Sequence, residues 1–165
     1  MAAGLGTVRS ESIRFQENTG NAAGGNAGVW SASFEVPVGA VIIDVLVHAT
    51  ALWTATTSAT LIVGDATVDD GFYTAVDLKA TDLLAAEALS FANPAGQFGA
   101  DLVYDYASVA SIGASYIKRR MLAAARTLSA KVTTVGTPVT TRPGDTTVVF
   151  VYAYPSPIGA SFVTS

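Results

Sequence analysis

The residues best suited to hold an ion lie in one short acidic segment, DATVDDG. Its three carboxylates belong to Asp65, Asp69 and Asp70, and Gly71 closes the segment. Calcium takes several oxygen ligands from a flexible loop, so these side chains are the candidate metal ligands of the chain. Their spacing differs from the EF-hand pattern D-x-D-x-D-G, which is followed by a distant glutamate. A solvated turn is therefore the favoured interpretation, and we expect neither a bound metal nor a cofactor.

Acid–base and nucleophilic chemistry have few candidate residues. The single histidine, His48, stands between Val47 and Ala49 in an apolar run, so we interpret it as a core or interface side chain. Asp101 and Asp105 form a carboxylate pair, but a glycosidase pair is recognised by its separation in space, which a sequence does not give. The patterns G-x-S-x-G, H-E-x-x-H and G-x-x-x-x-G-K-S/T do not occur. We therefore predict a protein that is not an enzyme and has no catalytic residue.

The basic residues gather in one short cluster. It comprises Lys118, Arg119, Arg120 and Arg126. Aromatic residues are not interleaved among them, as they would be in a platform for single-stranded nucleic acid. The net charge of −4 also argues against a nucleic-acid partner, which needs a basic face. Of the two interpretations, a patch that forms salt bridges with an acidic neighbouring subunit is favoured over a nucleic-acid face.

Charge is scarce along the whole chain. Charged residues make up 13% of it, against ~25% in ordinary soluble domains, while hydrophobic residues reach 50%. A dispersed monomer carries more surface charge, so we expect much of this surface to be buried in a homo-oligomer. The alternative is a monomer with a Thr- and Ser-rich surface. The longest apolar run, Val41 to Val47, contains Asp44 and is too short to span a bilayer, so no membrane partner is expected.

The elements that must position these residues are mostly strands. Residues Val29 to Val36 alternate apolar and polar side chains, which is typical of a half-buried strand. Residues Val41 to Ala49 are apolar on both parities, which predicts a strand buried on both faces, and Ala59 to Val63 returns to complete a meander. Leucine spacing predicts a helix over Asp77 to Leu89. Residues Ile117 to Arg126 are either a second helix or a loop. Further strands are predicted over Thr7–Phe15, Leu128–Val135 and Thr146–Tyr154, and Asp101–Tyr116 is strand or irregular.

Seven or eight strands separated by turn signals indicate the fold class. We predict an all-β protein, an antiparallel β-sandwich that is jelly-roll-like, with one or two short helices. The expected organisation is a single domain over residues 1–165. Within it, residues 1–28 form a partly extended N-terminal segment and residues 155–165 a C-terminal tail that reaches a neighbouring subunit.

The stretch from Val36 to Leu78 resembles a recurrent segment of small structural proteins of tailed bacteriophages. There a P-x-G-A-x-I/V-x-D-V strand is followed by a T-S-A-T-L-x-V-G-D strand and a D-x-D-G-F/Y loop. Here the matching residues are Pro37 to Val45, Thr57 to Asp65, and Asp69 to Phe72. The closing segment AKVTTVGTPVTTRPGDTTVVFVYAY is similar to the final hairpin of such proteins. These motifs contain no catalytic group, so they bear on the fold and on the kind of assembly to which the protein belongs.

The resemblance implies a virion component. The favoured kind of virion component is a capsid decoration or head-auxiliary protein, and the favoured oligomer is a homotrimer. Such a protein is made in the bacterial host cytoplasm, lies on the capsid surface and binds the major capsid protein. The alternative is a tail- or fibre-associated β-sandwich that binds carbohydrate or a cell surface. Its stacking platforms would be Trp53, Tyr73, Tyr104 or Tyr106.

Overall fold

The computed structural model describes residues 7–17, 27–93, 95–97, 99, 102–104, 115–117, 125–137 and 144–154. In these residues all regular structure is β, so the all-β prediction is confirmed and no helix accompanies it. The longer strands are β1 (Thr7–Gln16), β2 (Ala27–Val36), β3 (Val41–Ala51), β4 (Ser58–Asp65), β9 (Arg126–Val135) and β10 (Asp145–Tyr154). The shorter strands are β5 (Tyr73–Asp77), β6 (Ala88–Leu89), β7 (Leu102–Tyr104) and β8 (Ser115–Ile117).

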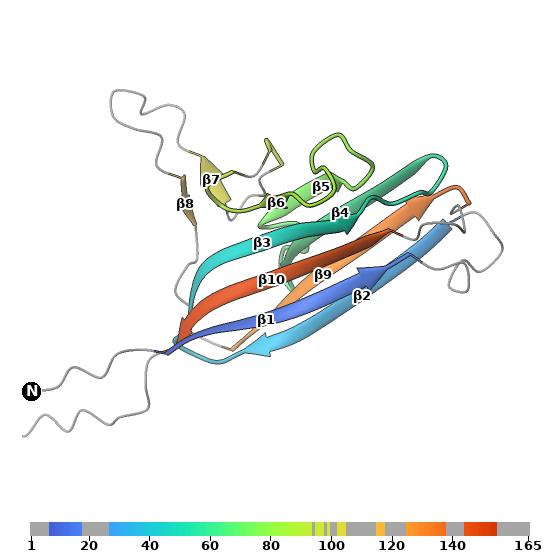
Figure 1. The fold of residues 1–165 in the computed structure, drawn as a ribbon. Helices are drawn as coiled ribbons and strands as arrows, with labels where there is room; N and C mark the ends of the chain where they lie inside the picture. The colour runs from blue at the N-terminus through green and yellow to red at the C-terminus, as the bar shows by residue number, and fades with distance from the viewer. Residues whose placement is uncertain are drawn as a thin grey trace, which may run out of the picture.

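Eight of these strands form two antiparallel sheets that lie face to face as a β-sandwich (Figure 1). The β1 sheet has the order β1-β10-β3-β6, and the β2 sheet has the order β2-β9-β4-β5. Strands β7 and β8 pair with each other in a separate small hairpin. The first described strand therefore pairs with the last, with Thr7 opposite Tyr154. The predicted tail and most of the predicted N-terminal segment lie outside the described residues.

The predicted meander is wrong, because the three consecutive strands β2, β3 and β4 do not pair with one another. Strand β3 belongs to the β1 sheet, while β2 and β4 both flank β9 in the β2 sheet. Between β2 and β4 the chain therefore crosses from one sheet to the other at residues 37–40 and back again at residues 52–57. Trp53 lies in the second crossing and is buried in the core. Alternating apolar residues show that a strand has one buried side. They do not show whether the strand pairs with its neighbour in sequence or lies in the opposite sheet, because its apolar side is buried in both cases.

Strand β3 is buried on one face, whereas its sequence predicted burial on both faces. A β-bulge explains the difference. Its pairing with β10 shifts register, because Val151 lies opposite Asp44 whereas Tyr152 lies opposite Ile42. The extra residue changes the parity of the inward positions from Ile42 to Val45, Val47 and Ala49, all of which are buried. A bulge thus places apolar residues of both parities on the same face.

The predicted helix over Asp77 to Leu89 is also wrong. Strand β5 ends at Asp77, turns follow, and β6 begins at Ala88. Ala80 and Ala86 have positive φ angles of 89° and 68°, which lie outside the right-handed helical region. Leu84 of this segment is 49% exposed, while the other leucines reach the core separately, Leu78 and Leu83 from the connection between β5 and β6 and Leu89 from β6 itself. The other helix candidate ends in strand β8 on one side and β9 on the other, and residues 118–124 lie outside the described part of the chain.

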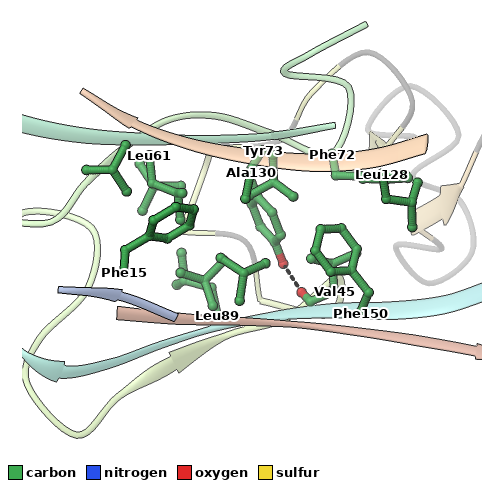
Figure 2. Close-up of a cluster of buried hydrophobic side chains, with 14 of the residues drawn as sticks. Phe15, Val45, Leu61, Phe72, Tyr73, Leu89, Leu128, Ala130 and Phe150 are labelled. Carbon is green, nitrogen blue, oxygen red and sulfur yellow. Dashed lines mark hydrogen bonds between the residues drawn. The ribbon is translucent and has the colours of Figure 1, made fainter. Parts of the chain in front are cut away.

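The core lies between the two sheets, where aromatic rings of both meet (Figure 2). Phe34 of β2 packs edge-on against Phe150 of β10, with ring centroids 5.1 Å apart. Tyr73 of β5 spans the core and donates a 2.8 Å hydrogen bond to the backbone carbonyl of Val45 in β3 (Figure 2). Apolar burial supplies most of the driving force for such a fold, and directed contacts of this kind fix how one sheet sits on the other.

Candidate interaction surfaces

The outer side of the β1 sheet carries a cluster of aliphatic side chains among polar ones. Because Val148, Phe150 and Tyr152 of β10 are buried, the alternate residues of this strand point to the opposite side of the sheet. Pairing then aligns whole rows of side chains across β1, β10 and β3. Of the aliphatic members of these rows, Val8 is 60% exposed and the others are partly exposed. The polar members are Ser10, Ser12, Arg14, Asp44, His48 and Thr147. We call the following set the aliphatic face: Val8, Val41, Leu46, Val149, Val151 and Ala153.

The outer side of the β2 sheet has a different chemistry. Leu128, Ala130 and Val132 of β9 are buried, so the residues that alternate with them face outward, and these are Ser129, Lys131 and Thr133. Across β2, β9 and β4, pairing continues this pattern on the neighbouring strands. We call this set the hydroxyl face: Ser31, Ser33, Thr60, Ser129 and Thr133. Aliphatic side chains thus gather on one outer surface of the sandwich and hydroxyl groups on the other, with charged residues on both. Solvent-exposed aliphatic clusters are a feature of interaction surfaces.

The acidic loop is held together by its own side chains. Asp65 is buried, and its Oδ1 accepts hydrogen bonds from the backbone amides of Thr67 at 2.7 Å and Val68 at 2.8 Å. Its Oδ2 pairs with Nε of Arg126. Asp69 lies outward and forms a 2.9 Å salt bridge with Lys131.

The three candidate metal ligands therefore have unlike surroundings. Asp65 is buried at the base of the loop, Asp69 is exposed, and Asp70 is partly buried. Among the residues that the structure describes, no group of three or more His, Cys, Asp or Glu side chains could hold a metal ion. Burial raises the pKa of Asp65, but the amides of Val68 and Thr67 and the charge of Arg126 outweigh it and hold this pKa below its usual range.

Arg126 does not belong to a surface patch, so that part of the basic-cluster prediction is wrong. Its side chain is 8% exposed and is enclosed between Asp65 and the ring of Phe72, whose centroid lies 5.2 Å from the guanidinium carbon. Lys118, Arg119 and Arg120 lie outside the described residues, as do Asp101 and Asp105.

The structure also corrects the interpretation of His48. This side chain is exposed on the outer side of β3, opposite Thr147 of β10 and Ala88 of β6. The core interpretation is wrong, because the bulge in β3 places His48 on the outward parity. A role for His48 in an interface stays a prediction.

Two of the predicted stacking platforms are buried, so a carbohydrate cannot stack on them. Trp53 is 3% exposed and its Nε1 donates a 2.9 Å hydrogen bond to Oγ1 of Thr146. Tyr73 is fully buried and bonded to Val45. The side chains of Tyr104 and Tyr106 lie outside the described part of the chain.

Sequence reasoning missed the carboxylate of Glu17, which joins three segments at one end of the sandwich. This side chain is 2% exposed. Its Oε2 accepts hydrogen bonds from the backbone amide and the hydroxyl of Thr54, both at 2.8 Å, and from the amide of Gly144 at 3.1 Å. Its Oε1 accepts a bond from the amide of Ala55 at 2.8 Å. The stretch that follows it in sequence is rich in Gly, Asn and Ala, which gave no signal of a buried anchor.

A second pair at this end was also missed. The guanidinium of Arg14 in β1 forms a two-pronged contact with the carboxylate of Asp145 in β10, and Nε lies 2.9 Å from Oδ1. The hydrogen bonds from Arg14 lower the pKa of Asp145. Both Glu17 and Asp145 thus serve the fold, since every partner identified for them lies within this chain.

Comparison with known proteins bears on the fold alone. No family model matches the chain, and no curated protein matches it. A chain in the acidic stable capsid structure of Helicobacter pylori bacteriophage KHP30 is similar, with a TM-score of 0.53 and 14% identity over 92% of this chain and 91% of that chain. A chain of the cyanophage Pam1 capsid asymmetric unit gives a TM-score of 0.47 and 18% identity, covering 92% and 87% of the two chains. No helix of the described residues is long and apolar enough to cross a membrane.

Proposed function

We propose that this chain is a structural component of a phage virion, a capsid decoration protein that binds the assembled shell, and that it is not an enzyme. The observation that carries the proposal is the shared fold with a chain of the KHP30 capsid structure, which extends over nearly the full length of both chains. The resemblance of the segment from Pro37 to Phe72 to phage structural proteins supports the same setting independently. The burial of Trp53 and Tyr73 counts against the carbohydrate-binding alternative.

We also infer that the sandwich is a jelly roll of one domain. The strand pairings nest: β1 with β10, β2 with β9, β3 with β6, and β4 with β5. Nested pairing of this kind is what a long antiparallel ribbon gives when it is rolled into two sheets of four strands. The hairpin of β7 and β8 is then an insertion between the sixth and ninth strands.

The aliphatic face is the surface that we assign to the shell. A protein that binds only the assembled lattice stabilises it by mass action, because its binding free energy adds to that of assembly. Burial of Val149, Val151 and Leu46 against the major capsid protein would supply that free energy through apolar contact. The scarcity of charge noted in the sequence suits such a contact, and a homotrimer on the capsid surface remains our preferred assembly.

Co-sedimentation with purified phage shells tests this proposal. We expect the protein to pellet with shells and to raise the temperature at which they break open. Val149→Glu should weaken this binding, because it places a charge at the centre of the aliphatic face. Ser129→Glu is the matched control, since Ser129 is also partly exposed on the outer side of a central strand. Failure to bind any shell, or a stable monomer that binds oligosaccharides instead, would overturn the proposal.

A further inference from the structure

Two long strands lie on the same side of the sandwich, and neither pairs with a further strand among the residues that the structure describes. Strands β1 and β2 are each ten residues long, and each is the outermost strand of its sheet. Figure 1 shows them along one margin, β1 beside β10 and β2 beside β9. An edge strand presents a row of backbone N–H and C=O groups that another chain can pair with, so stable monomers protect such edges.

Strand β1 carries a recognised form of edge protection. Its residues Glu11 and Arg9 lie opposite Phe150 and Tyr152, so their side chains are on the core side of the sheet although they are exposed. Inward-pointing charges discourage the addition of a further strand, because pairing would bury them. A second chain added at β1 would have to cover both of these charges.

Strand β2 has no such protection. From Ala27 to Phe34 it contains no charged residue and no proline, and its pairing with β9 runs without a bulge over the whole strand. Val29 is 62% exposed, and residues 31–33 are exposed as well. The indole Nε1 of Trp30 is buried without a hydrogen-bond partner. An edge strand that lacks charges, prolines and bulges is open to pairing with a strand of another chain, so β2 is a candidate pairing site.

We propose that β2 pairs antiparallel with β2 of a second copy of this chain, across a two-fold axis at Ala32. Such a contact is isologous, and it joins the two β2 sheets into one continuous sheet. Because side chains alternate along a strand, even-numbered residues must lie opposite even-numbered residues of the second copy. Only then do the core sides of the two strands lie on the same face of the joined sheet. Centring on Ala32 sets Trp30 opposite Phe34 of the second copy. Centring on Ser31 or on Ser33 would set one of these aromatic side chains opposite Ala32 instead.

The second copy is the favoured occupant because the strand is complementary to itself in this register. The one charge of β2, Glu35, falls opposite Val29, so like charges do not meet. On the outer side Ser31 falls opposite Ser33, which extends the hydroxyl face of each sheet into that of the other. Aromatic pairs and hydroxyl pairs directly opposite each other both stabilise antiparallel strands. A two-fold contact closes on itself, so it produces dimers from monomers or links two larger oligomers in a pair.

Cysteine cross-linking tests the register directly, since the chain contains no cysteine of its own. In the proposed pair, residue 32 lies opposite itself, with Cβ atoms about 5 Å apart, which is close to the reach of a disulfide. We therefore expect Ala32→Cys to form a disulfide-linked dimer under mild oxidation. Ser10→Cys, on the exposed part of β1, is the control and should stay uncross-linked. Equal yields for the two variants would overturn the proposal.

Charge variants separate pairing from mere stability. S31K/S33K places lysine opposite lysine twice in the pair and should weaken association by about tenfold or more. S31K/S33E places lysine opposite glutamate twice and should retain association. Light scattering gives the mass and thermal melting confirms folding, because both positions are exposed. Native protein that shows no two-fold species at any concentration, or two variants that associate equally, would overturn the inference. Shell binding is measured separately, so the proposed function and this inference can fail independently.

Discussion

The phenol oxygen of Tyr73 in β5 donates a hydrogen bond of 2.8 Å to the carbonyl of Val45 in β3, so one side chain connects the two sheets through the core. Burial raises the pKa of Tyr73 above its usual range, and the negative charge of Asp44 raises it further. The phenol therefore remains protonated, and remains a donor, wherever the protein is folded.

Tyr73→Phe should lower the free energy of unfolding by about 1–2 kcal/mol, because it removes the donor to Val45 and leaves the ring in place. Chemical denaturation measures the loss. In native protein, an absorbance titration at alkaline pH should show Tyr73 ionising only as the fold is lost. Early ionisation of every tyrosine, or a variant as stable as the native chain, would contradict this account.

Glu17→Gln should destabilise the protein by about 3 kcal/mol or more, because the amide group cannot accept all of the hydrogen bonds from Thr54, Ala55 and Gly144. The matched control is Glu11→Gln, which makes the same chemical change at an exposed position of β1, the strand that directly precedes Glu17. Thermal melting compares the two. Equal melting temperatures would show that the buried carboxylate does not anchor the loops.

Stability should fall as the solution is made acidic. The pKa values of Asp65 and Asp145 are both lowered in the folded protein, so the unfolded chain takes up protons on these groups first. Their contribution is complete above the unfolded pKa of about 3.9 and is lost as pH falls through the lower folded values. Denaturation between neutral pH and pH 2 measures this slope. Asp145→Asn should flatten it, and an unchanged slope in that variant would count against the role of Arg14.

Ala80→Gly should stabilise the protein by about 0.5–1 kcal/mol, contrary to the usual effect of glycine. Ala80 has a φ of 89°, where a Cβ atom is strained and glycine is not. Ala85→Gly is the control, because Ala85 is also exposed in the same connection and does not have a positive φ. We expect the control to be neutral or destabilising. The reverse order of stabilities would contradict the assignment of strain to Ala80.

The strands could be predicted from the sequence because their signal is local. Residues 29–36 and 128–135 alternate cleanly, and both are strands with one buried side. The sheet to which each strand belongs is not a local property. Whether β3 pairs with β2 or crosses to the other sheet depends on short connections and on the burial of Trp53, which become visible only when the core is assembled.

The failures at the candidate site have a similar cause. His48 was interpreted as a core or interface side chain, and the core alternative fails because the sequence hides the bulge that turns this residue outward. The helix over residues 77–89 was inferred from leucine spacing, but in the structure these leucines lie in an irregular connection and in strand β6. Glu17 and Asp145 were invisible because their partners lie far away in the sequence, and a carboxylate gives no sign of burial until those partners are known.

The nesting of the strand pairs also determines when this protein can fold. Among the described strands, β1 pairs only with β10, and β2 only with β9. During synthesis, residues 7–36 must therefore wait until residues 126–154 have left the ribosome. Pairings so distant along the chain make folding slow and leave bare strands open to aggregation meanwhile. Production of this protein should thus benefit from slow expression at low temperature, and joining its two ends should speed its refolding.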